Sequence, residues 1–127
     1  MVGGLDGIHE MLGGLVVVAF IVMAILAAIM ATGRDIRWIR QASFIAAGLL
    51  ALQYLVGVLL LTRGFSNSPT HIVIALLVLV PVALQHSSAR RLSSQTRGVA
   101  LLIWALAAAL LSVIAYMTGM AGVGVPA

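Results

Sequence analysis

Four long stretches without a charged residue constrain this chain more than any other feature of its sequence. They comprise residues 11–33, 41–62, 64–89 and 98–127, and each holds 22 residues or more. A helix needs about 20 apolar residues to cross the hydrocarbon core of a bilayer, and it satisfies its own backbone hydrogen bonds there. The sequence therefore predicts an all-α integral membrane protein with four transmembrane helices.

The composition agrees with this fold class and excludes several others. The chain is 63% hydrophobic and 8% charged, whereas a soluble domain is about half apolar and about a quarter charged. It has no Cys, which excludes disulfides and thiolate metal sites. Its basic residues, all Arg, form no clustered basic face, so we expect the lipid bilayer as a partner and no nucleic acid.

Capping residues and helix breakers set the expected helix boundaries. We expect one domain with helices over about residues 6–31, 38–61, 69–87 and 95–120. Ser68 followed by Pro69 is typical of a helix start, with a Ser N-cap and Pro at the first helical position. Pro81 removes a hydrogen bond inside the third helix and predicts a bend there. Because the connections are short, the sequence predicts an up-down-up-down bundle.

The arginines predict how this bundle is oriented. Six of them lie in the first and third connections: Arg34, Arg37, Arg40, Arg90, Arg91 and Arg97. Only Arg63 lies on the opposite side, together with Asp6 and Glu10. The positive-inside rule therefore predicts that both termini lie outside (N-out/C-out). Because no basic residue precedes the first apolar stretch, the first helix does not resemble a cleavable signal peptide. We expect the cytoplasmic (inner) membrane of a prokaryote.

Two histidines occupy matching positions near helix starts. His9 follows Asp6 by three residues, and His71 follows Ser68 by three. If Asp6 and Ser68 are N-caps, both histidines are third helical residues at the same depth, close to the outer surface. First and third helices are commonly diagonal in such a bundle. Two facing imidazoles at one depth predict a bis-histidine metal site for heme b.

Further residues are candidates for holding the same cofactor. Gly13, four residues after His9, leaves space for a flat macrocycle. Gln53 lies in mid-membrane, where it faces the cofactor's lower edge or simply joins helices by a hydrogen bond. Arg63 is a natural partner for the heme propionates, although it equally fits a headgroup anchor.

A second interpretation of the two histidines, as ordinary residues of the membrane interface, stays open. Histidine is common near membrane interfaces, where its polar tip reaches water, so His9 and His71 fit that role as well. The remaining histidine, His86, lies about 22 Å from His71 along the helix at 1.5 Å per residue. We interpret His86 as part of the basic inner surface and expect no second heme there.

The residues around both histidines resemble the heme A synthase family. His9 with the following Gly13-Gly14-Leu15-Val16-Val17 is similar to its ligand helix. The stretch Leu52-Gln53-Tyr54-Leu55-Val56-Gly57-Val58-Leu59, leading to His71, is similar to its approach to the second histidine. The resemblance covers the first three helices and hardly the fourth. It implies a heme site between His9 and His71.

This chain departs from that family at several points. It has one four-helix half, where typical members have two. Asp6 stands where the family often has a Glu thought to matter in catalysis, so the resemblance implies Asp6 as a candidate catalytic residue. Glu10 stands where an Arg commonly follows the histidine. The resemblance therefore implies a heme site in this chain more directly than it implies the conversion of heme O to heme A.

Three functional hypotheses follow. The first is a heme b-binding electron-transfer protein that exchanges electrons with a quinol or a cytochrome, as a homodimer or within a larger membrane complex. The second is a heme A synthase-like oxidoreductase, and the sequence leaves open whether the chain is an enzyme. The third is a cofactor-free accessory or structural subunit of a respiratory or photosynthetic membrane complex.

Overall fold

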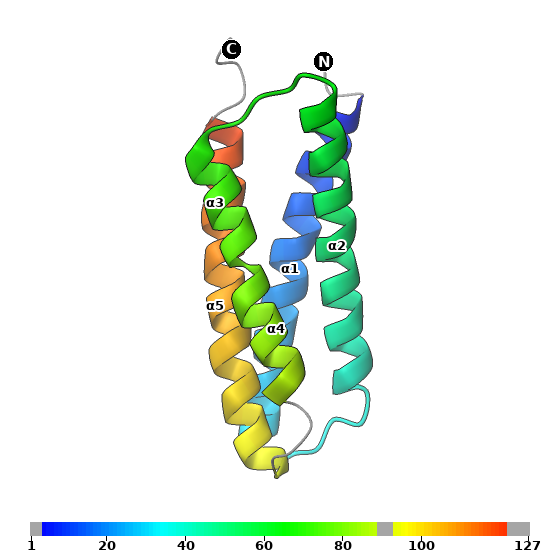
Figure 1. Ribbon diagram of the computed structural model, residues 1–127. Helices are drawn as coiled ribbons and strands as arrows, with labels where there is room; N and C mark the ends of the chain where they lie inside the picture. The colour runs from blue at the N-terminus through cyan, green and yellow to red at the C-terminus, as the bar shows by residue number, and fades with distance from the viewer. Residues whose placement is uncertain (1–3, 89–92, 122–127) are drawn as a thin grey trace.

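The computed structural model describes residues 4–88 and 93–121 (Figure 1). They form five α-helices and, in this part of the chain, no strand. The helices are α1 (Leu5–Ala31), α2 (Ile39–Thr62), α3 (Pro69–Leu77), α4 (Leu79–Ser88) and α5 (Ser94–Ala121). α1 and the α3–α4 segment run one way along one elongated bundle, and α2 and α5 run the other way, so α1 begins and α5 ends at the same end of it. Arg90 and Arg91, which the sequence places in the third connection, lie outside the described residues.

Four helical segments are long and apolar enough to cross a membrane, as the sequence predicts. They are Leu5–Ala31, Ile39–Thr62, Pro69–Ser87 and Gln95–Met120. The outer surface of the bundle is covered by large apolar side chains such as Ile25, Ile45 and Leu110, each more than half exposed. An all-helical chain with four such segments is confirmed.

The third segment is interrupted where the sequence predicts a bend. α3 ends at Leu77, and α4 begins at Leu79 after the single residue Val78. Pro81 has no N–H to donate to the carbonyl four residues earlier, that of Leu77, so the α-helical pattern breaks there. The predicted cap is also present, because the Ser68 side chain accepts a hydrogen bond from the His71 backbone N–H at 3.2 Å.

The start of α1 differs from the expectation. Its N-cap is Gly4, which offers no side-chain hydrogen bond, and Asp6 lies inside the first turn. Gly is tolerated as an N-cap, and an acid in the first turn still interacts favourably with the helix dipole. The prediction that Asp6 caps the helix is therefore wrong. His9 is the fifth residue of α1, whereas His71 is the third residue of α3.

The bundle consists of two helical hairpins joined along one close seam. α1 packs against both α2 and α5, and α3 and α4 pack against α5. The α1–α5 seam is lined by small residues, and a Cβ at Gly98 would lie 2.4 Å from the backbone nitrogen of Ala31. The buried core contains Phe20, Met23 and Leu101. Consequently α1 and α5 form the closely packed centre of the molecule.

α2 meets α3 and α4 mainly through polar side chains. The Tyr54 hydroxyl donates a hydrogen bond to the backbone carbonyl of Ala75 in α3. Farther along, Gln85 of α4 donates to the Ser43 hydroxyl of α2 at 3.3 Å. This seam is therefore held at separate points, and a cavity can form between them beside Tyr54.

Residues 62 positions apart occupy equivalent places in the two hairpins. His9 and His71 are one such pair, and both lie in the first two turns of their helices. Other pairs share their residue type or their burial: Val16 and Val78, Ile39 and Leu101, Ala46 and Ala108, Tyr54 and Tyr116, Gly57 and Gly119. The two hairpins thus carry an approximate internal repeat of residue type and burial in which the histidines hold equivalent places, although only the α1–α5 side of the bundle is closely packed.

Candidate functional site: two facing histidines

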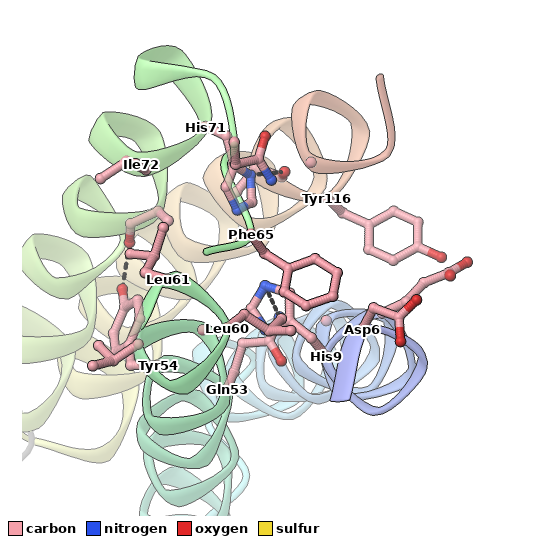
Figure 2. Close-up of a pocket in the computed structure, with 18 of the residues that line it drawn as sticks. Asp6, His9, Gln53, Tyr54, Leu60, Leu61, Phe65, His71, Ile72 and Tyr116 are labelled. Carbon is pink, nitrogen blue, oxygen red and sulfur yellow. Dashed lines mark hydrogen bonds between the residues drawn. The ribbon is translucent and has the colours of Figure 1, made fainter. Parts of the chain in front are cut away.

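The imidazole rings of His9 and His71 face each other across the bundle. Their ring centroids are 6.3 Å apart and the ring planes make an angle of 79°. Figure 2 shows the two side chains pointing toward one another from α1 and α3. The predicted meeting of these histidines at one level is confirmed, although they are not at the same helical position.

His71 is held at three points. Its backbone N–H is bonded to the Ser68 side chain. Its ring atom Nδ1 lies 2.7 Å from the backbone carbonyl oxygen of Ala115 in α5. A carbonyl only accepts, so Nδ1 carries the proton and Nε2 keeps its lone pair. The ring also packs on Gly119, where a Cβ would lie 2.9 Å from Cε1.

His9 is held more loosely, although its surroundings are similar. Its Nε2 lies 3.4 Å from the amide nitrogen Nε2 of Gln53 in α2. An amide nitrogen only donates, so the lone pair of His9 Nε2 accepts this long contact. Nδ1 is buried without a hydrogen-bond partner. The ring packs on Gly57, where a Cβ would lie 3.1 Å from Cε1.

Both histidines line a cavity of about 660 Å³. Its walls come from α1, α2, the α2–α3 connection, α3 and α5. This volume is within the roughly 300–1,000 Å³ typical of small-molecule and cofactor sites. Polar atoms without a partner face this region, among them Gln53 Oε1 and the hydroxyl of Ser112, which is 5% exposed. The cavity can therefore hold a large ligand that also offers hydrogen-bonding groups.

The structure brings most of the predicted site residues to this cavity. Asp6, Gly13 and Gln53 line it together with both histidines. The space beside Gly13 is occupied by protein, since a Cβ there would lie 3.1 Å from Gln53 Nε2 and 3.2 Å from Tyr116 Cδ2. Gly13 thus permits a close approach of neighbouring side chains, and the open space that the sequence predicts beside it is filled.

Two acidic residues and one arginine lie at this end of the bundle. Asp6 and Glu10 are exposed at the cavity wall. Arg63 is the C-cap residue of α2, is exposed, and does not line the cavity. The structure therefore does not bring Arg63 to the site, where the sequence predicts a propionate partner.

Several residues of the site belong to no sequence motif that would predict them. Gly119, the Ala115 carbonyl and Ser112 all lie on α5, which carries no residue that stands out by its chemistry. The internal repeat identifies two of them, because Gly119 and Ala115 lie 62 residues after Gly57 and Gln53. The 62-residue spacing of the two histidines, if applied to the whole chain, would have predicted the positions of Gly119 and Ala115.

His86 belongs to a separate polar cluster near the opposite end. Its Nδ1 lies 3.4 Å from the Ser43 hydroxyl, and its ring makes an edge contact with Phe44 at a centroid distance of 4.5 Å. Arg40 lies over the Phe44 ring at 5.7 Å. Gln85 belongs to the same cluster, because it donates a hydrogen bond to the Ser43 hydroxyl from α4 to α2.

The described residues contain no group of three or more His, Cys, Asp or Glu side chains able to hold a metal ion. The chain matches no protein-family model, and neither the curated proteins nor the solved structures include a match. The resemblance to the heme A synthase family therefore stays a prediction.

Proposed function

We propose that this protein is a membrane-integral heme b protein in which His9 and His71 would hold the heme iron. The observation that carries this proposal is the 6.3 Å between the ring centroids. Two metal–nitrogen bonds of about 2 Å, together with about 1 Å from each nitrogen to its ring centre, add up to about 6 Å. The separation of the rings therefore matches the span of two imidazoles that share one metal ion.

The surroundings of the rings support a heme. Ligating histidines almost always donate their second ring N–H to an oxygen acceptor, as His71 does to Ala115. Gly57 and Gly119 provide the room in which the two rings lie. Two imidazoles supply only two donors, and the heme macrocycle supplies the other four. When bound, heme provides one-electron redox chemistry.

The bilayer would surround this site near one of its surfaces. The four apolar segments support a multi-pass protein, and Arg34, Arg37 and Arg40 support a cytoplasmic location for the α1–α2 connection. The histidines lie at the opposite end, so the heme would lie toward the extracytoplasmic side. We infer the cytoplasmic membrane of a prokaryote as the location.

Electron transfer is the role that the site supports best. If both His9 and His71 held the iron, no ligand position would be left for a substrate, which favours electron exchange with a quinol or a cytochrome over substrate chemistry. The partner would approach the extracytoplasmic end, either a second copy or a larger membrane complex. A heme A synthase-like oxidation is the second candidate, and it is favoured by the location of Asp6 at the cavity wall.

Absorption spectroscopy with a matched set of variants tests the heme. The protein is purified in detergent, supplemented with hemin, and freed of excess on a desalting column. We expect a low-spin spectrum from wild type and from the control His86→Ala, because His86 lies in the separate cluster with Ser43 and Phe44. His9→Ala and His71→Ala should lose that spectrum. A wild-type protein without a Soret band would overturn the proposal and favour an accessory subunit.

A further inference from the structure

The two histidines differ in how firmly they are held. We propose that His71 is the permanent ligand and His9 the exchangeable one, so that a small uncharged donor such as carbon monoxide binds in place of His9. This inference rests on the proposed heme and concerns only how the two ligands share it. The two histidines occupy equivalent positions of the internal repeat, yet His71 is firmly held and His9 is not.

The hydrogen bonds of His71 favour permanent ligation. The Ala115 carbonyl accepts from Nδ1 at 2.7 Å, which fixes the tautomer with a free Nε2 lone pair and makes that nitrogen a stronger donor. Ser68 anchors the backbone of the same residue. The ring and the backbone of His71 are thus both already fixed, so its side chain loses little conformational freedom when the metal binds.

The contacts of His9 favour exchange. Its Nδ1 has no acceptor, so no outer partner strengthens its donor nitrogen. The amide N–H of Gln53 shares the lone pair of Nε2 at 3.4 Å, and this contact competes with a metal for the same electrons. The equivalent position in the other hairpin is Ala115, whose side chain cannot compete. His9 therefore gains less from ligation than His71 does.

The charges around His9 determine which ligands can replace it. Asp6 and Glu10 lie on the same helix as His9, four residues apart on one side of it, and both line the cavity. The one basic residue at the end of α2, Arg63, does not line it. A negative wall repels anions such as azide, so the exchangeable position favours an uncharged donor.

Variants of the two histidines give the first test. Reduced, heme-loaded His9→Ala should keep its heme, become high-spin and bind carbon monoxide rapidly. His71→Ala should lose heme at least about 10-fold more readily, because losing only the outer partner of a ligand already costs about 10–100-fold in affinity. Equal loss in both variants, or greater loss in His9→Ala, would overturn the inference. A wild type that binds no heme would instead refute the proposed function.

The glycines under the rings give a milder matched pair. Gly119→Ala would place a Cβ 2.9 Å from His71, and Gly57→Ala would place one 3.1 Å from His9. We expect Gly119→Ala to release heme faster, and Gly57→Ala to retain heme while binding carbon monoxide several-fold faster than wild type. The opposite order contradicts the inference. Circular dichroism of both variants checks that the bundle has folded.

Discussion

Tyr54 of α2 donates a hydrogen bond to the backbone carbonyl of Ala75 in α3, and this bond joins the two hairpins at the wall of the histidine cavity. α2 otherwise packs closely against α1, so this contact and the Ser43–Gln85 bond are the main polar links across the seam. Removing each link should therefore have its own effect on the cavity and on the free energy of unfolding of the bundle.

Tyr54→Phe removes the upper link without changing the ring. We expect the free energy of unfolding to fall by about 1 kcal/mol, the usual net worth of one hydrogen bond, measured by denaturant titration in detergent. Tyr116→Phe is the control, because the Tyr116 hydroxyl makes no hydrogen bond among the described residues, and it should leave stability unchanged. Equal effects of the two variants would contradict the role of this link.

Ser43→Ala and Gln85→Leu should change stability unequally. Ser43→Ala leaves the Gln85 amide buried without its acceptor, and we expect a cost of about 1–3 kcal/mol. Gln85 is 1% exposed and its Oε1 already lacks a partner, so Gln85→Leu removes an unsatisfied polar group and should be nearly neutral. Thermal unfolding of both variants measures the difference. A larger loss for Gln85→Leu would show that the amide has a partner essential to the fold.

Gly98→Ala should disrupt the close seam between α1 and α5. The added Cβ would lie 2.4 Å from the Ala31 backbone nitrogen, and overpacking of this kind costs about 1–3 kcal/mol. The control is Gly48→Ala, where no atom lies within 4 Å and the helix gains up to about 1 kcal/mol. The melting temperatures should therefore move in opposite directions, and a stabilised Gly98→Ala protein would contradict the seam.

Arg63→Gln tests an expectation that the sequence raises and the structure does not support. Because Arg63 is exposed and does not line the cavity, we expect its loss to leave heme affinity unchanged within about twofold, in the range of a surface substitution. A hemin titration followed by absorbance measures this affinity. A 10-fold weaker affinity would show that the guanidinium does reach a propionate.

The sequence predicts the architecture well because each signal acts locally. The charge-free stretches determine the spans, Ser68 and Pro69 determine the start of α3, and Pro81 determines its interruption. The Asp6 prediction is wrong because Gly4, two residues earlier, already serves as the N-cap of a helix that starts at Leu5. Local signals alone do not decide between two neighbouring starts of this kind.

The site is predictable only in part. The pairing of His9 with His71 follows from their positions near helix starts. Their unequal hydrogen bonds do not, because the Ala115 carbonyl and the Gln53 amide come from helices far away in sequence. The bond from His71 also uses a backbone atom, which leaves no trace in residue type. Such contacts depend on the rotation of α2 and α5 within the bundle.

The nearly perpendicular rings give the most direct test of a shared heme. Electron paramagnetic resonance of the oxidised, heme-loaded protein reports the relative orientation of two axial imidazoles. From the 79° between the ring planes, we predict the highly anisotropic low-spin signal of crossed imidazoles, absent from His71→Ala and retained in His86→Ala. A high-spin signal alone, or a signal that survives in His71→Ala, would contradict ligation by this pair.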